Sequence, residues 1–126
     1  MSIRLNHTVV YAKNHEASAR EFADVMGLPR GIIAGAGYEF TAVHINSELS
    51  IYFMNHDNIT LEQHLAFDVD GHSFDLMLNQ LKEKKIPFGS TPFERENHRT
   101  YHDFASRGIF WTNMDGCLFE IMTNER

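Results

Sequence analysis

An order of sequence patterns that occurs twice is the strongest constraint on how this chain can fold. Alternating apolar residues predict strands, and apolar residues at three- and four-residue spacing predict helices. In the first half the predicted order is strand, helix, strand, strand, at residues 4–12, 16–26, 39–45 and 48–55. The second half repeats that order at residues 62–69, 71–85, 107–113 and 117–123. We therefore expect two similar modules, at about residues 1–56 and 60–126, in a single domain.

Residue spacing supports the duplication. His7 and His64 are 57 residues apart, and each lies near the middle of the first predicted strand of its module. The closing strands of the two modules match at an offset of 68, which keeps the apolar positions in register and pairs Tyr52 with Glu120. The glycine-rich segment GIIAGAG at residues 31–37 is predicted to be a flexible connection rather than a strand.

Composition excludes several classes of protein. The 126 residues suffice for one core, and a formal net charge of −6 disfavours nucleic acid as a partner. No apolar run approaches the roughly 20 residues of a membrane helix, and the start MSIRLNH lacks the apolar stretch of a signal peptide, so we expect no membrane partner and a cytoplasmic location. The single cysteine, Cys117, excludes an intrachain disulfide and is expected to be buried rather than catalytic.

Three potential metal ligands lie at related positions of the repeat. The more uniformly apolar side of each strand should pack on a helix, so His64, Glu120 and Tyr52 should face a common cavity, and His7 should do so by the repeat. Two imidazoles and one carboxylate form a ligand set suited to Fe²⁺, which also accommodates Mn²⁺, Ni²⁺ or Zn²⁺. Taken alone, a histidine on a strand is more often a hydrogen-bonded structural residue. Glu120, however, lies in the apolar run LFEIM and requires a positive group beside it.

The sequence also resembles a known family. The segments that carry the resemblance are LNHTVV followed by EFADVMGL, then EQHLAFDV, and finally RGIFWTNMDGCLFEIMT. They are similar to the vicinal oxygen chelate superfamily, which includes glyoxalase I, extradiol dioxygenases, fosfomycin-resistance enzymes and bleomycin-binding proteins. The resemblance implies an α+β fold of two βαβββ modules, curved mixed sheets that enclose a metal-binding cavity, and a homodimer. It also implies that His7, His64 and Glu120 are the metal ligands.

These expectations together predict a metal-dependent enzyme that acts on a small molecule. The substrate would chelate the metal through adjacent oxygens, and the chemistry would be that of an extradiol dioxygenase or of a lyase or isomerase. Four-ligand glyoxalase chemistry is disfavoured, because Tyr52 stands where glyoxalase I generally supplies a glutamate. Tyr52 is instead a candidate to donate a proton or hydrogen bond to the substrate, or else a tyrosine that fills the cavity.

The long polar segment at residues 90–106 is predicted to be a lid that confers substrate choice. Within it, Tyr101 and His102 are candidates for acid or base catalysis, with a solvated loop as the alternative. Arg107 is predicted to pair either with a substrate carboxylate or with one of two nearby carboxylates, those of Glu94 and Glu96. The histidines at positions 15, 56 and 72 are predicted to be surface or capping residues.

A hypothesis of another class is a metal-free binding protein. Bleomycin-resistance proteins, which are relatives within the superfamily, sequester a drug in a groove between subunits. The acidic net charge suits a cationic antibiotic. The presence of all three potential ligands argues against this alternative.

Overall fold

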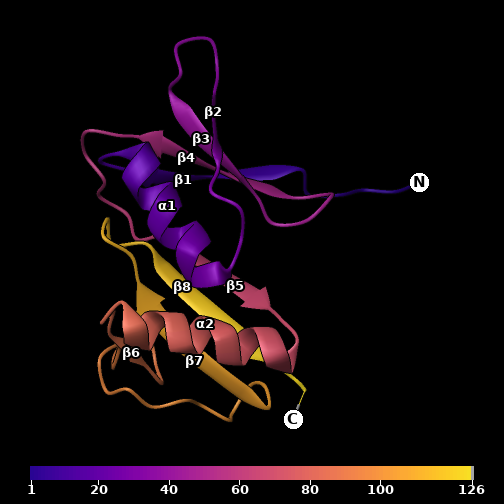
Figure 1. The fold of residues 1–126 in the computed structure, drawn as a ribbon, viewed down its shortest axis with the longest axis vertical. Coiled ribbons are helices and arrows are strands. Elements are labelled where there is room, and N and C mark those ends of the chain that lie inside the picture. The colour runs from indigo at the N-terminus through magenta and orange to yellow at the C-terminus, as the bar shows by residue number, and fades with distance from the viewer. Residues whose placement is uncertain (126) are drawn as a thin grey trace. The chain divides into compact units, whose positions relative to one another are not determined.

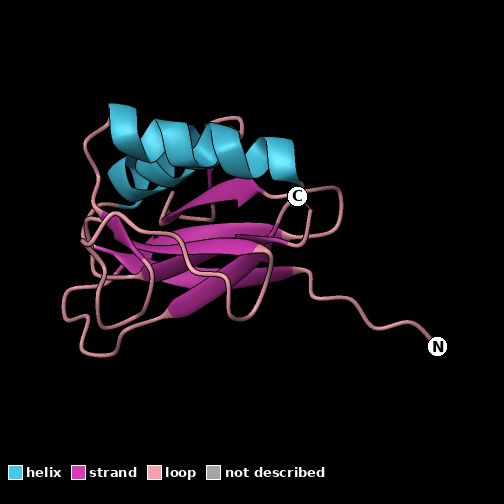
Figure 2. Ribbon diagram, turned by 90° about the horizontal axis from the view of Figure 1, so that it is seen from below, coloured by secondary structure: helices cyan, strands magenta, loops and turns pink. Residues whose placement is uncertain are grey.

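The computed structural model describes residues 1–125, which form two compact units, one over Met1–Leu61 and one that begins at Glu62. Each unit is a four-stranded mixed sheet with one helix on one face (Figure 1). Residues 1–6 run as an irregular segment ahead of the first strand (Figure 2). No helix within the described residues is long and apolar enough to cross a membrane.

The first unit contains one helix and four strands. They are β1 (His7–Ala12), α1 (His15–Met26), β2 (Ile32–Ala34), β3 (Phe40–His44) and β4 (Ser50–Asn55). The strands lie in the order β1-β4-β3-β2, with β1 parallel to β4 and the other pairs antiparallel. Helix α1 packs on β3, β4 and β1.

Residues at both ends of α1 fix where the helix begins and ends. Asn14 caps its first turn, because the side-chain oxygen accepts a hydrogen bond of 3.0 Å from the backbone N–H of Ala17. Gly27 ends the helix in the left-handed conformation, with a φ of 68° that residues with a Cβ rarely adopt.

The second unit repeats the order of the first. Its elements are β5 (His64–Asp68), α2 (Gly71–Glu83), β6 (Phe88–Gly89), β7 (Arg107–Thr112) and β8 (Leu118–Thr123). The strands lie in the order β5-β8-β7-β6, and β5 is parallel to β8. Helix α2 packs on β8 and buries Phe74, Met77 and Leu81.

The strand registers confirm the duplication and the α+β fold of two βαβββ modules. His7 lies opposite Ser50 in the first sheet, and His64 lies opposite Leu118 in the second. The offset between these partners is the predicted 68 residues, so Tyr52 and Glu120 occupy the same position in β4 and β8.

Two short strands differ from the prediction. Residues 31–37 are not only a connection, because β2 pairs with β3 inside them. Its side chains are largely exposed, Ile32 by 62%, so they leave no alternating apolar pattern to recognise. Phe88 and Gly89, where no strand was predicted, pair with β7 as β6. A side chain at Gly89 would collide with the backbone of Glu94, so this glycine allows the following loop to fold back over the strand.

His15 is not the surface residue that its position at a helix start predicted. Its ring is buried, and Nδ1 lies 2.6 Å from the Thr41 hydroxyl oxygen in β3. Its backbone N–H donates to the side chain of Asn55 at the end of β4. The first turn of α1 is thus fastened to the sheet by polar contacts.

Candidate metal centre

Two of the three predicted ligands meet in the second unit. His64 begins β5 and Glu120 lies in the middle of the neighbouring strand β8, where Ala66 is its direct partner. Because side chains alternate along a strand, His64, Ala66 and Glu120 lie on one face of this sheet. His64 Nε2 is 3.1 Å from Glu120 Oε1, with the histidine side chain 44% exposed and the glutamate side chain 10% exposed.

The other oxygen of Glu120 is held by Tyr101. The buried phenol donates a hydrogen bond of 2.5 Å to Glu120 Oε2. The pKa of Tyr101 is raised above its usual value, mainly because the phenol is buried. The hydrogen bond to Glu120 and the negative charge of that carboxylate raise it further. The phenol therefore stays protonated at neutral pH and acts as a hydrogen-bond donor.

The surroundings of the carboxylate are apolar. Tyr101, Phe110 and Leu118 form a buried cluster beside it, and Phe110 is the direct cross-strand partner of Glu120. A carboxylate in these surroundings requires a positive group beside it, and within residues 1–125 His64 lies in ion-pair distance of Glu120. A protonated imidazole or a bound cation is needed to balance this buried charge.

The donor pair has the chemistry and the separation that a metal ion requires. Neighbouring nitrogen and oxygen ligands bound at about 2.1 Å and at right angles lie about 3 Å apart. His64 Nε2 and Glu120 Oε1, 3.1 Å apart, match that separation. No third histidine, cysteine, aspartate or glutamate of residues 62–125 joins them to form a set of three.

The third predicted ligand, His7, lies in the first unit in contact with Tyr52. The two rings are stacked, with centroids 4.3 Å apart, and Tyr52 stacks on Phe40 on its other face. His7 Nδ1 donates to the Asn6 side-chain oxygen at 2.8 Å. A neutral ring with its proton on Nδ1 would leave Nε2 as the nitrogen that could coordinate a metal ion.

Of the two loop candidates, the structure brings Tyr101 to Glu120 and leaves His102 elsewhere. His102 is exposed, with Nδ1 2.7 Å from the backbone oxygen of Ser106 and Nε2 3.3 Å from the Thr100 hydroxyl. Both of its ring nitrogens are engaged within the loop. Its role in acid or base catalysis stays a prediction, without a contact to Glu120.

Of the two pairings predicted for Arg107, the one with Glu94 or Glu96 is wrong, and the one with a substrate carboxylate stays a prediction. Its guanidinium instead donates to Asp75 of α2 at 2.6 Å and lies over the Phe74 ring, 4.6 Å from the ring centre. Arg107 is at an odd position of β7, on the helix side of the sheet, whereas its neighbour Gly108 is on the Glu120 side. The structure therefore gives Arg107 a role in fastening α2, away from the candidate centre.

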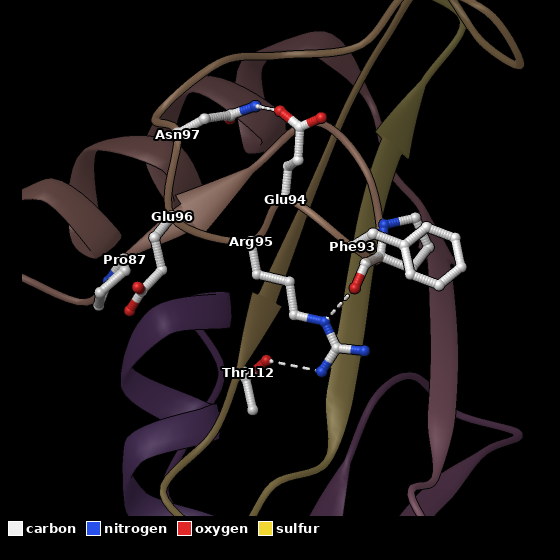
Figure 3. A pocket seen from close by; sticks show the side chains of 8 residues that line it. Pro87, Phe93, Glu94, Arg95, Glu96, Asn97 and Thr112 are labelled. Atoms are coloured by element: carbon white, nitrogen blue, oxygen red, sulfur yellow. Dashed lines mark hydrogen bonds between the residues drawn. The ribbon is translucent and has the colours of Figure 1, made fainter.

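Sequence reasoning missed the contacts of Arg95. It forms two hydrogen bonds of 2.7 Å to the carboxylate of Glu62, which lies two residues before His64, and a longer one to Thr112. Arg95 and Thr112 border a cavity of about 620 Å³ that is also lined by Glu94 and Glu96 (Figure 3). No local signal reveals the Glu62 contact, because the two residues are 33 positions apart.

Cys117 is buried, as predicted. Burial, together with nearby carboxylates, raises the pKa of its thiol to about 12. It is therefore a packed apolar residue and not a nucleophile.

The fold and this site define the class of protein. The chain has the fold of glyoxalase, bleomycin-resistance and dioxygenase proteins, which is the fold that the resemblance to the vicinal oxygen chelate superfamily implied. By sequence as well as by fold, it belongs to the family of two solved oxidases. Oxidase ChaP-H1 is 31% identical over 97% of this chain and 96% of its own, with a TM-score of 0.88. Oxidase ChaP-H2 is 30% identical over 98% and 94%, with a TM-score of 0.89.

A more distant structure shares the fold alone. The glyoxylase/bleomycin resistance protein/dioxygenase domain from Frankia sp. EAN1pec is 18% identical over 98% of both chains, with a TM-score of 0.73. Searches with protein-family models and against curated proteins found no match to this sequence.

Proposed function

We propose that the protein is a metal-dependent oxidase or dioxygenase whose metal is held by His7, His64 and Glu120. The observation that carries the proposal is the 3.1 Å pair of His64 Nε2 and Glu120 Oε1, in which a nearly buried carboxylate faces a partly exposed imidazole. The oxidase relatives, at 31% and 30% identity, support an oxidative reaction.

The ligand set favours Fe²⁺. Two histidines and one carboxylate are typical of non-haem iron enzymes, and Mn²⁺, Ni²⁺ or Zn²⁺ would also fit these donors. When bound, the ion would supply Lewis acidity toward two adjacent substrate oxygens and, as iron, reactivity with dioxygen. The substrate class proposed is therefore a small molecule with neighbouring oxygen functions.

The chain's own residues would prepare the site in separate ways. Tyr101 holds one carboxylate oxygen of Glu120 by its hydrogen bond. Phe110 covers the carboxylate and limits the access of water to it. Tyr52, stacked on His7, is the proposed hydrogen-bond donor to the substrate.

Metal analysis of protein purified without chelators tests the proposal. We expect about one divalent ion per chain in the wild type and its loss in the variants His7→Ala, His64→Ala and Glu120→Ala. His44→Ala is the matched control, because that histidine is exposed at the end of β3 and hydrogen-bonded only locally to Ser50. The proposal fails if the wild type takes up no ion stoichiometrically, or if the three variants retain it as the control does.

A metal-free drug-binding protein is the second candidate. It is favoured by the net charge of −6 and by the acidic residues Glu94 and Glu96 beside the cavity of about 620 Å³. Calorimetric titration of chelator-treated protein with bleomycin distinguishes the two. Tight binding without metal supports this candidate, and binding that is absent or needs added metal contradicts it.

We also propose that the protein is a cytoplasmic homodimer with no nucleic-acid partner. The resemblance to short members of the superfamily supports the dimer, and the acidic charge supports the lack of nucleic-acid binding. Light scattering behind size exclusion should give twice the chain mass of 14.5 kDa, and a mass of one chain would contradict the dimer.

A further inference from the structure

The contact between Gly108 and Tyr101 has no space for a side chain at position 108. A Cβ built on Gly108 would overlap the Cζ, Cε2 and hydroxyl oxygen of the tyrosine ring. The backbone of Gly108 is ordinary extended strand in β7, so the conformation does not require glycine. The glycine is required because the tyrosine ring lies directly on its backbone.

The backbone also fixes the tyrosine at this position. Tyr101 N–H donates to the Gly108 oxygen at 2.8 Å, and Gly108 N–H donates to the Tyr101 oxygen at 3.0 Å. The ring then packs against Phe110, with centroids 5.5 Å apart. The two backbone hydrogen bonds, together with the packing of the ring on Gly108 and Phe110, direct the phenol of Tyr101 to Glu120 Oε2.

We propose that Tyr101 is a positioning residue for the metal ligand Glu120, and that the bare backbone of Gly108 is what lets its phenol reach the carboxylate. The inference rests on the proposed function, because it assigns Glu120 to a divalent cation. The hydrogen bond restrains Oε2, so the carboxylate plane is fixed and Oε1 stays directed at His64 Nε2.

The physical reason lies in the surroundings of Glu120. The carboxylate is nearly buried beside the apolar Phe110 and Leu118, where no water shell can orient it. Without the phenol, Oε2 would lose the hydrogen bond that this structure gives it, and the carboxylate would turn to find another partner. A ligand that must be reoriented before it binds gives a weaker site.

The test is calorimetric titration of Co²⁺ into chelator-treated full-length protein, together with the visible absorption spectrum of the Co²⁺ complex. Tyr101→Phe removes only the hydroxyl, and we expect Co²⁺ to bind about tenfold more weakly, with an altered spectrum. Tyr38→Phe, at a 72% exposed tyrosine, is the matched control and should bind as the wild type does.

Gly108→Ala tests the steric part of the inference. It should also weaken Co²⁺ binding by about tenfold or more. Gly37→Ala, where a Cβ would meet only an ordinary contact with Glu39, should not. Since Gly108→Ala will lower the Tm as well, it is also measured in a Tyr101→Ala background. There the ring is gone, and the alanine should lower the Tm little or not at all.

The outcomes separate the two proposals. If the wild type binds no Co²⁺, the proposed metal site itself fails. If the wild type binds and Tyr101→Phe binds equally well with the same spectrum, the metal site stands and the positioning role of Tyr101 is overturned. If Gly108→Ala lowers the Tm equally with and without the tyrosine ring, the role of the bare backbone is overturned.

Discussion

Replacing Glu120 by glutamine should make the metal-free protein more stable and remove its metal binding. The amide has the same shape as the carboxylate. The amide oxygen can accept a hydrogen bond from the Tyr101 phenol, and the NH₂ group can donate one to a neutral His64 ring. Hydrogen bonds can therefore replace both of the contacts that Glu120 makes at 2.5 and 3.1 Å. What changes is that no charge has to be kept in the apolar surroundings of β8.

The magnitude follows from two opposing effects. Replacing a buried ion pair by neutral groups of similar volume is often neutral or stabilises a protein by about 1–4 kcal/mol, and this applies here when His64 is neutral and no buried charge is left behind. The hydrogen bond from Tyr101 loses its charge assistance, which costs about 1 kcal/mol. The net gain in the free energy of unfolding is therefore about 0–3 kcal/mol, which for a chain of this size raises the Tm by up to roughly 15 °C.

The assay is differential scanning calorimetry at pH 8 with excess chelator, and then with Co²⁺. We expect Glu120→Gln to unfold at a higher temperature than the wild type in chelator. Added metal at about 100 times its Kd should stabilise the wild type by about 2.7 kcal/mol and leave the variant unchanged. Glu96→Gln is the control, because that carboxylate is exposed in the loop.

A lower Tm of Glu120→Gln in chelator would refute this reasoning. It would mean that His64 and Tyr101 satisfy the carboxylate fully without a cation. The buried charge would then be no argument for a metal.

Three further predictions concern other contacts. The Cys117 thiol, with its pKa raised to about 12, should react with a thiol reagent at pH 8 only as fast as the protein unfolds, measured by absorbance with and without denaturant. Arg107→Ala should lower the Tm through the lost contact with Asp75 and leave Co²⁺ affinity unchanged; weaker metal binding would contradict its place on the helix side. The hydrogen bond from Arg95 lowers the pKa of Glu62 below 4.5, so its contribution to stability is present above that pH and is lost as the pH falls through the lowered value. Glu62→Gln should therefore lower the Tm at pH 7 and change it less at pH 3.

The sequence predicted the repeated elements because their signals are local and strong. An alternating strand or an apolar helical stripe is read within one segment, and the capping residues Asn14 and Gly27 lie next to the helix they bound. The strands β2 and β6 escaped prediction because they have only three and two residues and are defined by backbone pairing, which leaves no side-chain pattern.

Contacts between distant segments were harder to predict. The pair of His64 and Glu120 followed from the duplication, because the repeat supplied a register between strands 56 positions apart. No such guide existed for Tyr101, which sequence reasoning selected as a catalytic candidate without a partner. The same holds for Arg107, whose partner in α2 is 32 positions away, while the acidic residues considered for it, Glu94 and Glu96, lie in the loop before β7.

The pair of backbone hydrogen bonds between Tyr101 and Gly108 also closes the six residues between them into a loop. Their two ends are clamped together by a pair of backbone hydrogen bonds, and the segment includes Phe104, which is 81% exposed. Because the ends of the loop are held together, we expect that residues between them can be substituted without moving β7. Laboratory evolution aimed at new substrates would therefore do best to randomise residues 102–106 and to keep both clamp residues fixed.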